Sequence, residues 1–206
     1  MHERRPGLRE RKKERTRGLI ASTALALFSQ RGYQATTVAD IAEAAEVSER
    51  TVFGYFATKE DLLFADHLAL AEDLAHALQE GGDVPALDTL RSFVVENVGR
   101  FDEQARIRWE IVSQDELLLS HQRMRQAAFS ESIAKAIAEE LGEAVDDLRP
   151  QLVAAAVIAA FTATYEHRYR ARSQSASRAQ AVAVIDEAIT FLRGGLEAIR
   201  AFPKPY

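Results

Sequence analysis

The sequence predicts an all-α protein, and three observations carry this prediction. Proline and glycine are scarce, with five and ten copies among 206 residues, so few positions would break a helix. Alanine, leucine, glutamate and arginine, which favour helices, are abundant along the chain. No segment shows the alternation of β-branched and polar residues that is typical of a half-buried strand.

The first strong helix is expected from about Thr16 to Arg31. Steps of three and four residues place one apolar stripe along it, formed by Ile20, Ala24, Leu27 and Phe28. Gly32 follows at the position where a left-handed residue commonly ends a helix. The stripe predicts a helix that buries one face against its neighbours.

Two further helix starts follow within twenty residues. Thr37 and Asp40 form a capping-box pattern, which predicts a short second helix. Ser48 can cap a third helix that ends near Phe56, because its hydroxyl can accept a hydrogen bond from a first-turn amide. Two short helices separated by a turn of four residues, 45–48, are therefore expected here.

A second capping box, Thr58 with Asp61, predicts a long fourth helix to about Glu80. The glycine- and proline-containing segment 81–85 then breaks the chain. Pro150 is placed in the first turn of a later helix, and the serine-rich stretch 173–177 marks another turn. Nine helices are expected in total, the last five at about 86–102, 105–117, 120–141, 149–172 and 177–201.

Charge is distributed unevenly along the chain. The net charge is −5, yet residues 1–17 hold eight basic side chains against three acidic ones, a local charge of +5 on a body of −10. A basic end on an acidic body suits a protein that docks one end on phosphates. A solvated, disordered tail would have the same composition, so charge alone leaves both interpretations open.

Several classes of protein and site find no support in the sequence. The absence of cysteine excludes disulfides and thiolate metal sites. The charged N-terminus shows no signal peptide, and the longest apolar run, 152–163, is about half of a membrane span. Scattered histidines and missing phosphate-loop or nucleophile-elbow motifs argue against an enzyme, a metal site or a cofactor. We expect a cytoplasmic protein with no membrane partner.

Residues 37–56 have the spacing of a helix-turn-helix. The second helix of such a unit enters the major groove of DNA, and the first braces it. Val52 and Phe56 are expected to face inward, with Phe53 near the boundary. The remaining side chains can face outward, namely Arg50, Thr51, Gly54 and Tyr55. Many αα-hairpins without a DNA role share this spacing, so the pattern alone is only moderately specific.

The residues around this unit carry a more specific resemblance. Residues 35–63, ATTVADIAEAAEVSERTVFGYFATKEDLL, resemble the signature of the TetR transcriptional regulators, and LFSQRGY at 27–33 resembles the end of the family's first helix. The resemblance covers about residues 15–65. It implies a three-helix DNA-binding domain with a basic arm at 1–58, followed by a six-helix ligand-binding and dimerisation domain at 59–206.

The resemblance also implies which residues contact DNA. Thr37 corresponds to a phosphate contact at the start of the second helix, and Lys59 to the phosphate-binding lysine that opens the fourth. The recognition-helix contacts would be Thr51, Phe53 and Tyr55, with Arg50 and Gly54 at the variable positions that set the operator sequence.

Two residues depart from the family pattern. Glu46 replaces the usual glycine of the turn, which costs about 1 kcal/mol if the left-handed backbone is kept. Phe53 replaces the more usual tyrosine, so a hydroxyl-to-phosphate hydrogen bond is lost.

The last two helices are expected to form a dimer interface. A stripe at alternating steps of three and four residues is typical of helices that pack against a partner. Packing of the same stripe inside the monomer is the alternative, and the family's four-helix dimer bundle favours the homodimer. The predicted interface residues are Leu152 and Ala156 on one helix, and Val182, Ile185, Ile189, Leu192 and Leu196 on the other.

The middle of the chain is expected to enclose a small-molecule chamber, as in the family. Aromatic residues would line it, with three polar anchors, although aromatics at helical spacing also suit a plain core. The predicted lining residues are Phe93, Phe101, Trp109, Phe129, Phe161 and Tyr165, with Arg106 and His121 joining Tyr165 as anchors.

Together these features indicate a repressor that binds a palindromic double-stranded DNA operator as a homodimer and is released by a small apolar effector. A same-fold activator, or a regulator that answers to a protein partner, is the alternative. An all-α enzyme or carrier with an incidental helix-turn-helix is the third hypothesis.

Overall fold

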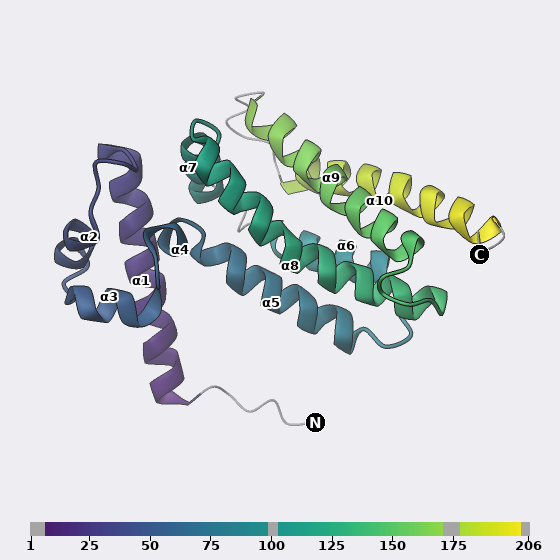
Figure 1. The fold of residues 1–206 in the computed structure, drawn as a ribbon, viewed down its shortest axis with the longest axis horizontal. Coiled ribbons are helices and arrows are strands. Elements are labelled where there is room, and N and C mark those ends of the chain that lie inside the picture. The colour runs from purple at the N-terminus through teal and green to yellow at the C-terminus, as the bar shows by residue number, and fades with distance from the viewer. Residues whose placement is uncertain (1–6, 99–102, 171–177, 203–206) are drawn as a thin grey trace. The chain divides into compact units, whose positions relative to one another are not determined.

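The computed structural model describes residues 7–98, 103–170 and 178–202, and within these ranges it contains ten helices and no strand. The predicted all-α class is confirmed (Figure 1). The helices are α1 (Leu8–Arg31), α2 (Val38–Ala44), α3 (Glu49–Tyr55), α4 (Lys59–Leu63), α5 (Ala65–Glu80), α6 (Ala86–Glu96), α7 (Glu103–Val112), α8 (Glu116–Leu141), α9 (Leu148–Arg170) and α10 (Arg178–Ala201).

The expected fourth helix is two helices, broken at Phe64, whose φ is −103° and ψ 20°. The break turns the Phe64 ring into the core, where it is fully buried. Arg108 Nε donates to the Leu63 carbonyl at 2.7 Å, and Arg17 Nη2 donates to the Ala65 carbonyl at 3.1 Å. Arginines from α7 and α1 thus satisfy carbonyls on both sides of the break, which local sequence patterns do not predict.

Other helix ends differ from the expected ones by several residues. α1 begins at Leu8 rather than near Thr16, so the described part of the basic segment is helical. α8 begins at Glu116, because Asp115 Oδ1 accepts hydrogen bonds from the amides of Leu117 and Leu118 and caps the helix. Pro150 lies in the first turn of α9, as predicted.

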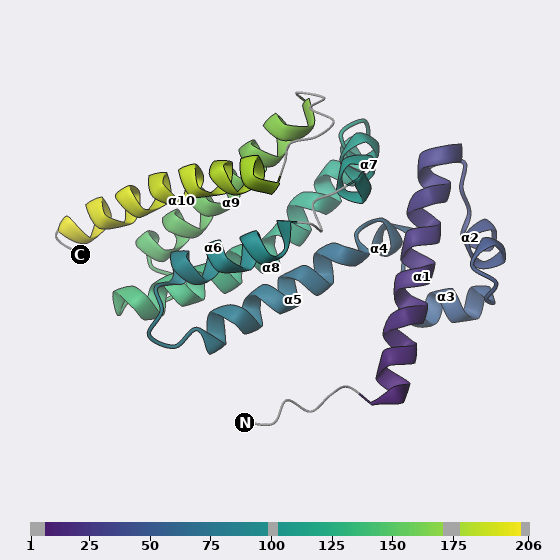
Figure 2. The same ribbon diagram turned by 180° about the vertical axis from the view of Figure 1, so that it is seen from behind.

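The chain forms two compact units, and the first contains residues 1–66 and 107–121. In its described part α1 packs against α2 and α4, and α2 packs against α3 (Figure 2). Its core is built on fully buried side chains, among them Ile20, Phe28, Ile41, Leu63 and Phe64. The division between residues 58 and 59 into DNA-binding and effector domains stays a prediction.

Three predicted caps hold the short helices of this unit. Thr37 and Asp40 make both bonds of a capping box at α2, and Thr58 and Asp61 do the same at α4. Ser48 Oγ accepts from the Thr51 amide at the start of α3. These local bonds fix where α2, α3 and α4 begin, and thus which residues face outward.

The turn between α2 and α3 has the strained backbone that the sequence suggested. Glu46 has a φ of 54°, in the left-handed region. Its amide bonds the Glu43 carbonyl at 3.1 Å, and the Val47 amide bonds the Ala42 carbonyl at 2.9 Å. These two bonds form a Schellman motif, which requires a left-handed residue at this position.

Replacing Glu46 by Gly is expected to raise the free energy of unfolding by about 1 kcal/mol, because glycine adopts this φ without the clash of a Cβ atom. Chemical denaturation measures the change. Glu46→Gln is the matched control, since it removes the charge and keeps the strain, and we expect it to change stability by less than about 0.5 kcal/mol. A destabilising Glu46→Gly would contradict the strain argument.

The second unit contains residues 67–106 and 122–206. In its described part α10 packs against α9 and α6, side by side in both views (Figures 1 and 2). Ion pairs hold α10 at its polar edges, between Asp186 and Arg91 at 2.6 Å and between Arg193 and Asp88.

The apolar stripe of α10 lies inside this unit. Ile185, Ile189, Leu192 and Leu196 are 1–6 % exposed and belong to the protomer's own core. The expectation that they form a seam between two chains is therefore corrected, because their surface is already covered by α6 and α9. Val182 is half-buried, and Ala156 is half-buried against the same core.

Candidate nucleic-acid interface

Two buried side chains anchor α3, the predicted recognition helix. Val52 is 1 % exposed and Phe56 is 3 % exposed in the core of the first unit. With the Ser48 cap, these anchors fix the rotation of the helix about its axis. The residues on the opposite side are then held outward by packing.

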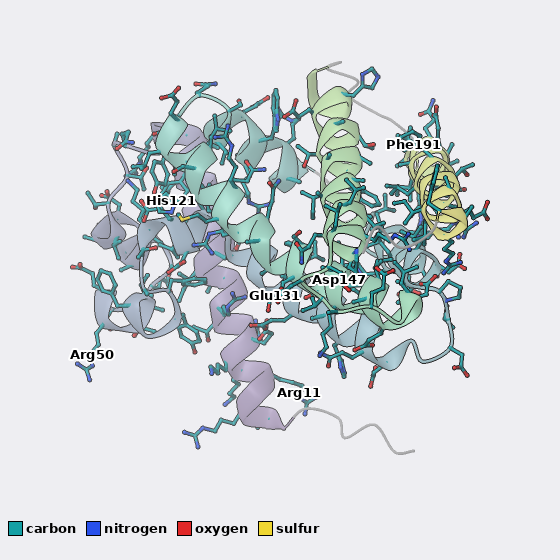
Figure 3. The ribbon with its side chains drawn as sticks, turned by 45° about the vertical axis from the view of Figure 1, so that its right-hand side comes forward. Arg11, Arg50, His121, Glu131, Asp147 and Phe191 are labelled. Atoms are coloured by element: carbon teal, nitrogen blue, oxygen red, sulfur yellow. The ribbon has the colours of Figure 1, made fainter. Side chains whose placement is uncertain are left out.

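That outward side carries most of the predicted base-reading residues. Arg50 is exposed and extends away from the ribbon (Figure 3). Phe53 is 52 % exposed, although it was expected near the boundary. A Cβ atom placed on Gly54 would meet nothing within 4 Å, so this part of the helix surface is open. A guanidinium, an aromatic ring and open backbone therefore share one surface, as contact with a DNA groove requires.

Two predicted contacts are less accessible. Tyr55, expected to face outward, is half-buried against the core of the unit. The Thr51 and Ser48 hydroxyls lie 2.8 Å apart and share a hydrogen bond. Thr51 is partly exposed, while Tyr55 packs between α3 and the core of the unit.

Thr37 is exposed at the start of α2, and its hydroxyl takes part in the cap of that helix. Its hydroxyl donates to Asp40 Oδ2 at 2.6 Å and accepts from the Asp40 amide at 3.1 Å. These side-chain and backbone bonds with Thr37 lower the pKa of the Asp40 carboxyl. A phosphate contact by this hydroxyl would require its proton to turn away from Asp40.

Lys59 is half-buried at the start of α4. Its ammonium lies 4.2 Å from the ring centre of Tyr33 and 5.8 Å from that of Phe28. Burial is the main influence on its charge and lowers the pKa of Lys59. No sequence pattern predicted this aromatic surrounding, because Tyr33 and Phe28 precede Lys59 by more than twenty residues.

Exposed cations continue along the start of α1. Its first turns carry five exposed basic side chains, Arg9, Arg11, Lys12, Lys13 and Arg15 (Arg11 is labelled in Figure 3). Arg17 differs, because its guanidinium lies 5.2 Å from the ring centre of Phe56 and bonds the Ala65 carbonyl. The first five are exposed cations, and Arg17 packs against the core of the unit.

The described residues predicted to line an effector chamber are divided between the two units. Phe93 is 9 % exposed in the core of the second unit, and Phe129 and Phe161 pack against that core. Trp109 and His121 belong to the first unit and are half-buried, as is Arg106 in the second. Phe101 and the side chain of Tyr165 lie outside the described residues.

The second unit instead has an open groove of about 590 Å³ between α8 and α9. Six of its ten lining residues are alanine, serine or threonine, and Gln126 Nε2 lies 3.4 Å from Thr162 Oγ1 across it. In the sequence, the alanine-rich composition of α9 is the feature that could have indicated this groove, because small side chains leave space beside a helix. The lining residues are Arg123, Gln126, Ala127, Ser130, Ala155, Ile158, Ala159, Thr162, Ala163 and Glu166.

Across the described ranges, no helix is long and apolar enough to cross a membrane. Within the same ranges, no group of three or more His, Asp or Glu residues could hold a metal ion.

Comparison with known proteins identifies the family. The model described as bacterial regulatory proteins, tetR family, matches residues 20–65, which include the helix-turn-helix and α4. A second model, the MftR C-terminal domain, matches residues 84–197. The chain belongs to the TetR family of transcriptional regulators.

Two relatives of this TetR-family regulator extend the match over most of its length. The HTH-type transcriptional regulator TcmR of Streptomyces glaucescens is 34 % identical over 73 % of this chain and 71 % of TcmR. MftR of Mycobacterium tuberculosis, named for regulation of mycofactocin biosynthesis, is 31 % identical over 80 % of this chain and 84 % of MftR.

Solved structures share the fold of this regulator at lower identity. Thermus thermophilus FadR, a TetR-family repressor in complex with lauroyl-CoA, has a TM-score of 0.58 and 22 % identity, over 92 % of this chain and 98 % of FadR. A complex of SmeT with triclosan has a TM-score of 0.62 and 19 % identity, over 85 % of this chain and 90 % of SmeT.

Proposed function

We propose that this TetR-family protein is a ligand-responsive cytoplasmic repressor that binds a palindromic DNA operator as a homodimer. The observation that carries the proposal is the outward face of α3, where Arg50, Phe53 and Gly54 are exposed on the side opposite the buried anchors. Side chains held in this way can meet base edges without reorganisation. The exposed cations of α1 supply the phosphate contacts that add affinity for any DNA sequence.

The proposed dimer uses a different face of α10 from the one the sequence suggested. Val184, Phe191 and Phe202 are 41 %, 74 % and 69 % exposed (Phe191 is labelled in Figure 3). With Ala188, Gly195 and Ala198 between them, they form a second apolar stripe at steps of three and four residues. Such a stripe on the outside of a protomer favours pairing with another helix.

α9 extends this exposed apolar face. Arg149 Nη2 donates to the Phe202 carbonyl at 2.8 Å, so the start of α9 lies beside the end of α10. Leu148 and Leu152 on that part of α9 are 68 % and 52 % exposed. Large exposed apolar side chains on two neighbouring helix ends favour an interaction site, and a two-fold axis would place them against their own copies. Leu152, an interface residue predicted from the sequence, is retained.

The proposed effector is a small, mostly apolar molecule. Two fold neighbours are named for complexes with triclosan and with lauroyl-CoA, and the acyl chain of the second ligand is apolar. The α8–α9 groove offers this regulator a largely apolar surface with the polar pair Gln126 and Thr162. Arg106, Trp109 and His121 stay candidate contacts, since each is half-buried.

If an effector releases the protein from DNA, the operator must in turn weaken binding of the effector. Lauroyl-CoA and triclosan are titrated into the protein with and without its selected operator duplex, and the two affinities are compared for each probe. An inducer should bind about 5- to 150-fold more weakly to the DNA complex, because the ligand and the operator change each other's affinity by the same factor. A scrambled duplex at the same concentration is the control.

If the probes bind and the operator never changes their affinity, they are not inducers. If a wider set of apolar ligands gives the same result, an activator or a regulator with a protein partner replaces the ligand-responsive repressor. Specific operator binding would stand in either case.

A further inference from the structure

The surroundings of Lys59 form a small aromatic seat, which we define as the rings of Tyr33 and Phe28. The two ring centres lie 4.9 Å apart at an interplanar angle of 59°. The Lys59 ammonium lies 4.2 Å from the Tyr33 ring centre, within the distance at which a cation is attracted to a ring face. Phe28 is the more distant ring at 5.8 Å.

Tyr33 is fixed at both ends of its side chain. Its ring is 9 % exposed and belongs to the core of the first unit. Its hydroxyl donates to Glu60 Oε1 at 2.9 Å, and Glu60 follows Lys59 directly in α4. The residue after Tyr33 adds a further tie, because Gln34 Nε2 donates to Asp115 Oδ2 at 3.1 Å. Packing and hydrogen bonds therefore hold the Tyr33 ring in place beside Lys59.

We propose that Tyr33 is a positioning residue for DNA binding: its ring holds the Lys59 ammonium in place at the start of α4, where the ammonium meets a phosphate. The inference rests on the proposed function, in which Lys59 contacts the DNA backbone. A free lysine side chain loses rotational freedom about several bonds when it binds a phosphate. A lysine that is already held against the ring has lost this freedom before DNA binds, so binding costs less entropy. Partial burial also strengthens the interaction of the charge with a phosphate, because water screens it less.

The same geometry permits an opposite role. A ring that holds the ammonium could keep it from the phosphate, in which case Lys59 would have to leave the aromatic seat on binding. Tyr33 could also act only as a core residue. The three roles differ in how substitutions at Tyr33 and Lys59 combine.

A double-mutant cycle on the full-length protein separates them. Tyr33→Leu, Lys59→Met and the double variant are compared with the wild type for affinity to a selected operator duplex over a range of salt. Tyr33→Leu is expected to lower affinity about five-fold for each protomer bound, the factor that corresponds to immobilising one flexible side chain. In the Lys59→Met background the same change should have no effect.

Two further variants control for folding and for the hydroxyl. Leu25→Ala removes a side chain of the same core, 4 % exposed, and should lose stability equally in both Lys59 backgrounds. Tyr33→Phe keeps the ring and loses the bond to Glu60, so it should rescue most of the affinity that Tyr33→Leu loses. Thermal unfolding verifies that each variant is folded at the temperature of the binding assay.

The ring also gives a spectroscopic signature. Ring currents should shift the Lys59 side-chain protons upfield, and the shift should survive Tyr33→Phe, fall sharply in Tyr33→Leu, where only the more distant Phe28 ring remains, and persist in the DNA complex. Loss of the shift on DNA binding would overturn the proposal, because the ring would then compete with the phosphate. Equal losses from Tyr33→Leu in both Lys59 backgrounds would overturn it as well.

If Lys59→Met leaves operator affinity unchanged, the positioning proposal is overturned because Lys59 makes no phosphate contact. The proposed function would survive that result as long as the protein still prefers its operator to a scrambled duplex.

Discussion

Operator affinity is expected to fall by about three orders of magnitude or more between 50 and 200 mM salt, the loss found for proteins with six to ten phosphate contacts. Each protomer presents five exposed cations at the start of α1, in addition to Lys59. A dimer would present twice as many cations. Six phosphate contacts would therefore form even if half of these side chains stay in solvent. The measurement is the slope of log affinity against log salt concentration.

Arg50 and Arg11 should respond differently to substitution by alanine. Arg50 lies on the outward face of α3, so Arg50→Ala should lower operator affinity by about ten-fold or more and barely change binding to a scrambled duplex. Arg11→Ala should weaken binding to both duplexes and reduce the salt slope by about one for each protomer bound.

Lys135→Ala is the matched control, because Lys135 is an exposed cation of α8 in the second unit. It should change neither affinity nor slope. Equal losses of operator and scrambled binding in Arg50→Ala would show that Arg50 contacts phosphate only. The assignment of α3 as the helix that reads bases would then fail.

The helix-turn-helix could be predicted from the sequence because short-range bonds determine it. Thr37, Ser48 and Thr58 each cap the helix that their position indicated, and Glu46 has the left-handed backbone expected of its place in the turn. In each case both partners of the bond lie within a few residues of one another. Patterns of three or four residues are therefore enough to locate these helix starts and the turn.

The aromatic seat of Lys59 and the break at Phe64 could not be predicted in this way. Both depend on residues distant in sequence, since Tyr33 bonds Glu60 of α4 across 27 positions and Arg108 bonds the Leu63 carbonyl across 45. Continuity of helical pattern predicted one long helix, because the arginine that stabilises the break lies on α7. A single sequence gives no sign of such a contact.

α10 shows why a correct pattern led to the wrong face. The helix has two apolar stripes, one through Ile185 and Ile189 and one through Val184 and Phe191, and both repeat at steps of three and four residues. Only packing distinguishes them: the first is nearly fully buried inside the protomer, and the second is exposed. Branched aliphatic residues on the first stripe made it the more conspicuous in sequence.

Replacing Phe191 by Arg is expected to convert the homodimer to monomers while leaving each protomer folded. Phe191 is 74 % exposed, so the arginine disturbs no core in the isolated chain. In the dimer it would place two unpaired charges against an apolar face, which costs several kcal/mol. Analytical ultracentrifugation at micromolar concentration measures the mass, and circular dichroism verifies the helix content.

Loss of the dimer should also weaken operator binding severely. A dimer binds both half-sites at once, whereas two monomers must each bind alone, and such linkage commonly raises affinity by two to four orders of magnitude. Phe191→Arg should therefore bind the full operator about as weakly as the wild type binds a single half-site. A half-site duplex provides that comparison.

Two arginine substitutions on the same helix serve as controls for this prediction. Thr190→Arg lies on an exposed side of α10 away from the apolar stripe, and it should stay dimeric. Ile189→Arg places a charge at a position that is 1 % exposed in the protomer's core, so it should unfold the second unit rather than dissociate it. A folded monomer from Ile189→Arg, together with a stable dimer from Phe191→Arg, would return the interface to the stripe through Ile185 and Ile189. A stable dimer from both would place the interface away from α10 altogether.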